Sequence, residues 1–115
     1  MLNNIVVVLR EDPMTTGRPV EGLRIALGLS TGSIPLMIIL LGKARILLTE
    51  DALDVKDAEI LEKYLPVIQE LELPLVIPQG SSEDYSIDPD FSVKEASLPE
   101  INSYLLNADR AMILG

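Results

Sequence analysis

The feature that most constrains the fold is an uninterrupted apolar run near the start of the chain, IVVVL at Ile5–Leu9. A strand with one solvent-exposed face alternates apolar and polar residues, whereas this run has no polar residue. Such runs are typical of parallel strands that are covered on both faces. The run therefore predicts an α/β protein in which helices cover a parallel sheet.

Four further segments are expected to be strands of the same sheet. Residues 34–42 (IPLMIILLG) and 74–78 (PLVIP) are short and apolar, like the first run. Residues 91–96 (FSVKEA) alternate as an edge strand would, and residues 110–114 (RAMIL) form the last strand. Helical patterns separate most of these runs, so we expect a single domain over residues 1–115, a three-layer α/β/α sandwich with a mostly parallel five-stranded sheet.

The helical segments carry local signals for where they begin and end. Pro19 suits the first turn of a helix with apolar residues at 20, 23, 26 and 27. Asp54 is expected to cap a helix over residues 55–71, whose buried stripe runs to Leu71 and which Pro66 should kink or split. Ser97 is expected to cap the last helix, with a glutamate three residues later completing a capping box. The intervening segment KARILLTED suggests one short helical turn.

Composition and charge exclude several classes of protein. The chain has 48% hydrophobic residues but only four aromatic ones, so its core should be aliphatic. Its longest apolar run, LMIILL, is far too short to cross a bilayer, and MLNNIVVV does not resemble a signal peptide, so we expect a cytoplasmic protein. Its net charge of −9 should repel both nucleic acid and anionic membranes.

The chain contains no cysteine and no histidine. This excludes thiolate chemistry, imidazole acid–base catalysis and nearly every zinc geometry. Glu11 and Asp12 follow the first strand, where receiver domains hold Mg²⁺, but the aspartate and the lysine that such a domain also needs are missing. We therefore expect no catalytic residue, no metal site and no cofactor.

Two groups of residues remain as candidates for binding or interface contacts. Arg10 and Arg18 are the cations nearest the end of the first strand, where they would meet an anion or a neighbouring subunit. The loop after the third predicted strand, in LPLVIPQGSSEDYSI, contributes Pro78, Gln79, Gly80, Ser81 and Ser82. Open α/β sheets bind ligands at the carboxyl ends of their strands, so an alternative hypothesis is a module that binds a small anion or a nucleotide through the backbone amides of residues 79–82.

Over nearly its full length the chain resembles the DsrE/DsrF-like proteins of sulfur-relay systems, and most closely their DsrF/TusC-type branch. The resemblance rests on four segments: IVVVLREDPMTTGRPVEGLRIAL, PLMIILLGKARILLTEDAL, LPLVIPQGSSEDYSIDPDFSVKEA and LLNADRAMIL. It implies a flavodoxin-like arrangement and assembly into trimers or hexamers.

Members of this family that carry sulfur have a cysteine just past the third strand, where it accepts a persulfide. Here that place falls on Pro78, with Ile77 and Gln79 as the alternatives one residue away. None of these residues can hold sulfur covalently. The resemblance thus implies a non-catalytic subunit that acts through protein contacts, with copies of itself and with a cysteine-bearing DsrE-like relative.

Overall fold

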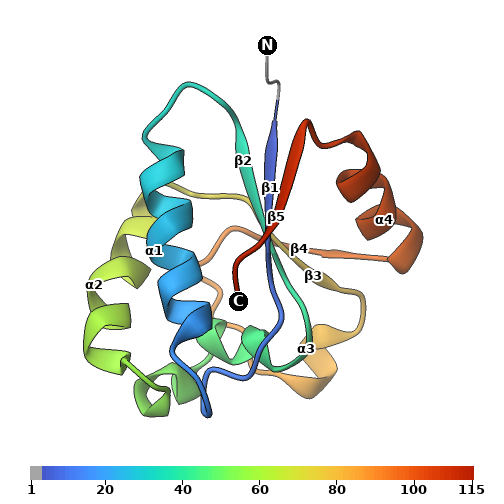
Figure 1. Ribbon diagram of the computed structural model, residues 1–115. Helices are drawn as coiled ribbons and strands as arrows, with labels where there is room; N and C mark the ends of the chain where they lie inside the picture. Colours follow the sequence, from blue (N-terminus) through green and yellow to red (C-terminus); the bar gives the residue numbers. More distant parts are fainter. Residues whose placement is uncertain (1–3) are drawn as a thin grey trace.

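The apolar run Ile5–Leu9 forms strand β1, and all five of its residues are buried. The computed structural model, which describes residues 4–115, pairs β1 with β2 (Leu36–Leu40) and with β5 (Arg110–Ile113) (Figure 1). Beyond β2 follow β3 (Leu75–Pro78) and β4 (Val93–Ala96), which completes the order β4-β3-β2-β1-β5. Every pair is parallel, so the expected α/β fold with five strands is confirmed. The order itself differs from the 2-1-3-4-5 order of flavodoxin.

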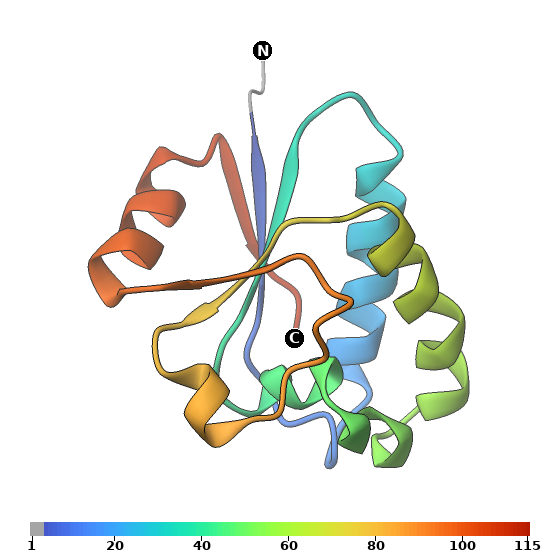
Figure 2. The ribbon, with the colours of Figure 1, turned by 180° about the vertical axis from the view of Figure 1, so that it is seen from behind.

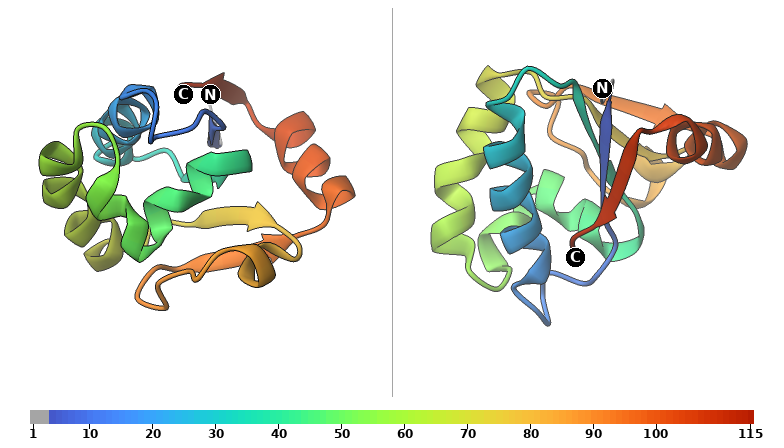
Figure 3. Two further views of the ribbon diagram at one scale, coloured as in Figure 1. Left: turned by 90° about the horizontal axis from the view of Figure 1, so that it is seen from below. Right: turned by 45° about the horizontal axis from the view of Figure 1, so that its top comes forward.

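The helices lie on the two faces of the sheet in unequal numbers (Figures 1 and 3). One face carries α1 (Arg18–Ser30) and α2 (Ala58–Glu70), together with the 3₁₀ helices η1 (Gly42–Leu48) and η2 (Glu50–Asp54). The opposite face carries α4 (Leu98–Asn107). A short helix, α3 (Ser81–Asp84), lies beyond the end of β3, as Figure 2 shows from behind.

The handedness of parallel connections accounts for this division. From β1 through β2 to β3 the chain advances in one direction across the sheet, so right-handed crossovers put α1 and α2 on the same face. From β4 it returns across the whole sheet to β5, in the opposite direction, and α4 therefore lies on the other face. The two expected outer layers are thus confirmed, although one of them is a single helix.

Alternate residues of the strands face the two layers. Ile5, Val7 and Leu9 belong to the larger cluster, which packs against α1, α2, η1 and η2, and Val6 and Val8 to the smaller one, which packs against α4. The buried side chains are almost all aliphatic, and Phe91 is the one buried aromatic residue among residues 4–115. The expectation of an aliphatic core is confirmed.

The second helix begins later than expected and is continuous through Pro66. Asp54 is the last residue of η2, and α2 instead begins after Asp57, which has a positive φ of 63° and makes no side-chain capping hydrogen bond. Pro66 does not split the helix, which continues to Glu70. Pro66 and the residue four positions before it are both exposed, so water can solvate the carbonyl that loses its amide partner.

Other local expectations have mixed outcomes. Ser97 caps α4, and the capping box with Glu100 is present in full. The segment KARILLTED forms η1 and the start of η2, which is more helix than the single turn expected. Leu71, expected in the buried stripe of α2, is the residue after the helix and is 53% exposed. Within residues 4–115, no helix has the length and apolar character needed to cross a membrane.

Candidate functional site

The loop after β3 is fixed by hydrogen bonds within the chain. The amide of Gln79 donates to the carbonyl of Ala96 (2.8 Å), which continues the pairing of β3 with β4 past the strand end. Gly80 has a φ of 89°, a conformation that glycine adopts without a steric penalty, and this turn leads directly into α3. The loop therefore leaves the sheet in one defined direction.

Ser81 is the only buried polar residue among residues 4–115. Its Oγ donates to the carbonyl of Pro78 (2.6 Å) and accepts from Nη1 of Arg45 (2.8 Å). Both hydrogen-bonding functions of this hydroxyl are thus satisfied, as burial requires. Neither partner is a base, so Ser81 has no group that would activate it as a nucleophile.

Arg45 completes the site from a different part of the chain. It lies in η1, directly after β2, and is half-buried. Its Nε donates to the carbonyl of Gly42 (2.8 Å), and its guanidinium carbon lies 4.5 Å from the ring centre of Tyr85. Sequence reasoning missed Arg45, because 36 residues separate it from Ser81 and only the pairing of β2 with β3 brings them together.

Ser82 makes a separate contact with the edge strand. Its amide and its Oγ donate to the Glu95 carboxylate, over 3.3 Å and 3.2 Å, and both residues are exposed. Within residues 79–82, the amides of Gln79 and Ser82 therefore donate inside the chain. Ligand binding by residues Pro78 to Ser82 remains a prediction.

Arg10 and Arg18 lie at the end of β1, two strands away from the β3 loop. Adjacent strands are about 4.8 Å apart, so the two groups of candidates are separated by roughly 10 Å. Nε of Arg18 lies 3.2 Å from the carboxylate of Glu11, which makes an exposed ion pair. Asp12 pairs with Lys43 (3.7 Å). Both acids that follow β1 are thus paired with bases of the same chain. Within residues 4–115, no group of three or more acidic side chains is placed to hold a metal ion.

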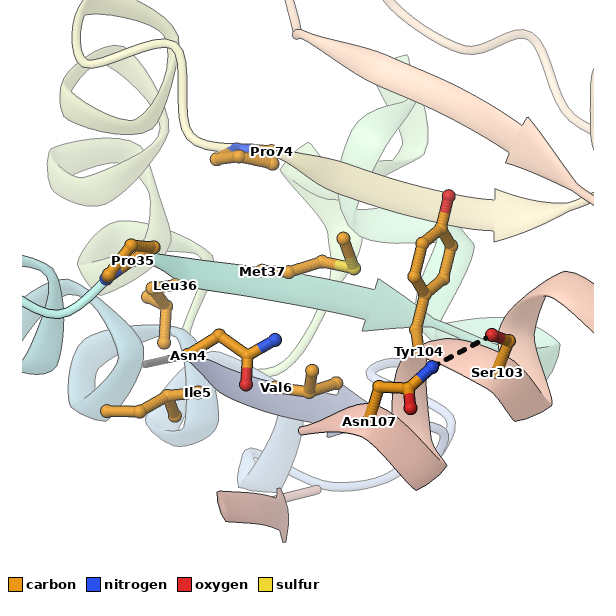
Figure 4. Close-up of a pocket in the computed structure, with 10 residues that line it drawn as sticks. All are labelled: Asn4, Ile5, Val6, Pro35, Leu36, Met37, Pro74, Ser103, Tyr104 and Asn107. Atoms are coloured by element: carbon orange, nitrogen blue, oxygen red, sulfur yellow. Dashed lines mark hydrogen bonds between the residues drawn. The ribbon is translucent and has the colours of Figure 1, made fainter. Parts of the chain in front are cut away.

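The opposite end of the sheet has a hollow on the side of α4, with a volume of about 380 Å³ (Figure 4). Met37 and Val6 lie along its floor, and the ring of Tyr104 stands at one wall (Figure 4). The Tyr104 hydroxyl accepts a hydrogen bond from Nζ of Lys94 (2.9 Å), and this bond raises the pKa of Lys94 above its ordinary value. None of the lining residues is charged: they are Asn4, Ile5, Val6, Pro35, Leu36, Met37, Pro74, Ser103, Tyr104 and Asn107.

The side of the sheet that carries α4 is here called the α4 face. Three large apolar side chains project from the helix and the strand after it: Leu98 and Leu106 of α4, and Ile113 of β5, are 71%, 84% and 59% exposed. Ile113 is paired with Val8, which belongs to the cluster that packs against α4. Successive residues of a strand face opposite sides of the sheet, and Met112 packs into the cluster on the other side, so Ile113 belongs to the α4 face. Parallel sheets normally have both faces covered, so an exposed isoleucine on β5 is unusual.

The comparisons with known proteins identify the fold. No model of a protein family matches the chain, and no curated protein matches it by sequence. Among solved structures, the crystal structure of the ychN protein from E. coli is similar, with a TM-score of 0.76 and 17% identity. The match covers 97% of this chain and 99% of that one. The chain therefore has the fold of the ychN protein, with a five-stranded parallel sheet flanked by helices.

Proposed function

We propose that the chain is a non-catalytic, oligomeric subunit of a DsrE/DsrF-like sulfur-relay system and acts through protein contacts. The observation that carries this proposal is the end of β3. By the resemblance, the place of the sulfur-accepting cysteine of relay members falls on Pro78, with Ile77 and Gln79 as the alternatives, and this chain has no cysteine. The Pro78 carbonyl accepts from the buried Ser81 hydroxyl, so the loop is held by internal hydrogen bonds instead of presenting a nucleophile.

The α4 face is the surface that we assign to these contacts. It has one helix where the other face has four helical elements, and it leaves Leu106 and Ile113 largely exposed. Burying apolar area contributes about 25 cal/mol per Å², so covering these side chains in a subunit interface would be favourable. Large apolar side chains that stay exposed on a subunit are candidates for contacts with a partner.

The partners that we propose are copies of the same chain, in a trimer or hexamer, and a cysteine-bearing relative of the same fold. The relative would supply the thiol that carries sulfur, and this chain would shape the site around it. We place the protein in the cytoplasm. The net charge of −9 argues against nucleic acid and anionic membranes as partners.

Light scattering coupled to size-exclusion chromatography tests the assembly at micromolar concentration. We expect a mass of three or six subunits, and a clean monomer would contradict self-assembly.

Intact-mass spectrometry after incubation with a persulfide donor tests the loss of sulfur transfer. We expect the mass to stay unchanged, and a stable sulfur adduct on the purified native chain would contradict a non-catalytic role.

A further inference from the structure

Arg45 is held in one orientation by three contacts within the chain. Its Nε and Nη1 donate to the Gly42 carbonyl and to the Ser81 hydroxyl, both over 2.8 Å, and its guanidinium stacks on the ring of Tyr85. A guanidinium has five N–H donors, of which these two bonds use two. The guanidinium is therefore positioned in advance, and three of its donors have no partner within residues 4–115.

The charge of Arg45 has no acidic counterpart in the described part of the chain. Acids outnumber bases by 18 to nine, and yet no carboxylate of residues 4–115 lies within ion-pair distance of this guanidinium. Half-buried cations are normally paired, because burial without a counter-charge costs free energy. Four other bases do have acidic partners: Arg18–Glu11, Arg24–Glu21, Lys43–Asp12 and Lys94–Glu100.

The turn that leads to Ser81 borders open space. Apart from the chain neighbours of Gly80, no atom lies within 4 Å of the position that a Cβ on Gly80 would occupy. Gly80 directly precedes Ser81, which contacts Arg45, and η1 and α3 follow the adjacent strands β2 and β3. This edge of the sheet, at the carboxyl ends of its strands, is where open α/β folds bind ligands.

We propose that Arg45 binds a small oxyanion at the carboxyl ends of β2 and β3, with Ser81 and Tyr85 as positioning residues. The planar fork of an arginine matches two oxygens of a phosphate, sulfate or carboxylate group. The amide of Ser82 already donates to Glu95, so the site depends on the guanidinium and not on the amides of α3. This proposal is independent of the subunit role, because it requires neither assembly nor a relay partner.

Titration followed by NMR tests the site on the intact chain. The probes are inorganic phosphate, sulfate and acetate, at constant ionic strength maintained with sodium chloride, and the signals are the Nε–H of Arg45 and the amide of Gly42. We expect saturable shifts with a dissociation constant on the order of a millimolar, as a single charge-assisted fork provides. Shifts with phosphate and sulfate alone identify a site for tetrahedral anions, shifts with acetate alone identify a site for carboxylates, and equal shifts with all three identify a site for oxyanions in general.

Variants with matched charge separate a specific site from general attraction. Arg45→Gln should weaken binding by about tenfold or more, because it removes the charge-assisted hydrogen bonds. Arg24→Gln makes the same change of charge on the exposed surface of α1 and should bind like the wild type. Arg45→Lys keeps the positive charge but removes the planar guanidinium. Ser81→Ala keeps the guanidinium but removes the hydroxyl that accepts from its Nη1. Both should bind more weakly than the wild type while circular dichroism shows an intact fold.

Three results would overturn the proposal. The first is the absence of saturable shifts in the wild type up to about 50 mM of each probe, well above the expected dissociation constant. The second is equal weakening by Arg24→Gln and Arg45→Gln, which would mean that overall charge governs binding. The third is wild-type affinity in Arg45→Lys, which would exclude recognition by the guanidinium fork. If Arg45→Gln does not fold, Arg45→Lys decides the question.

Discussion

Replacing Ile113 by aspartate should dissociate the proposed assembly while leaving the subunit folded. Ile113 is 59% exposed in the isolated chain, and burying a whole isoleucine side chain is worth about 1.5–3 kcal/mol. Covering the exposed part in an interface is then worth about 1–2 kcal/mol, or about 5- to 30-fold in affinity for each contact. Aspartate removes this gain and also adds a charge that the interface would have to desolvate. The cost to the isolated subunit should stay near 1 kcal/mol, the span of strand propensities.

Sedimentation velocity over a range of protein concentrations measures this effect. Leu53→Asp is the matched control, because Leu53 is 67% exposed but lies in η2, away from the α4 face. We expect Ile113→Asp to sediment as a monomer at concentrations where the wild type and Leu53→Asp remain assembled. Wild-type assembly of Ile113→Asp, or equal dissociation by both variants, would refute the reasoning that places the interface on the α4 face.

Four further substitutions test the local energetics. Ser97→Ala should lower the free energy of unfolding by about 1 kcal/mol in urea titrations, because it removes the cap of α4. Hydrogen bonds from Ser97 hold the pKa of Glu100 below its ordinary value of 4.5, so their stabilisation is present above that pH and is lost as the pH falls through the lowered pKa. The stability difference between wild type and Glu100→Gln should therefore shrink in acid, and a constant difference would exclude this linkage. Gly28→Ala should stabilise the chain by about 0.5–1 kcal/mol, since Gly28 lies inside α1 with open space around it. Gly22→Ala in the same helix should lack this gain, because its Cβ would lie 2.5 Å from a methyl carbon of the buried Leu9, and overpacking costs about 1–3 kcal/mol. Equal stability changes in the two glycine variants would contradict this account.

The parts of the fold that depend on local pattern were predictable. The run at Ile5–Leu9 indicated a strand covered on both faces, and all five residues are buried. The cap at Ser97 also follows from residues that are neighbours in the sequence, since the glutamate that completes it is three positions away. These features need no knowledge of which strands pair.

The parts that depend on pairing between distant segments were not predictable. The return of the chain from β4 to β5 leaves α4 alone on its face, and no local signal encodes this. The contact of Arg45 with Ser81 likewise requires β2 and β3 to be neighbours. The cap assigned to Asp54 was wrong because a second acid, Asp57, lies closer to the helix and the chain turns there with a positive φ.

Hydrogen–deuterium exchange at two protein concentrations tests the central claim most directly, namely that this chain acts through contacts made by its α4 face. At a concentration that favours assembly, we predict slower exchange in residues 98–107 and 110–113 than in the dilute protein, with no change in residues 50–54. Identical exchange of α4 and β5 at both concentrations, or slowing confined to η2, would contradict it.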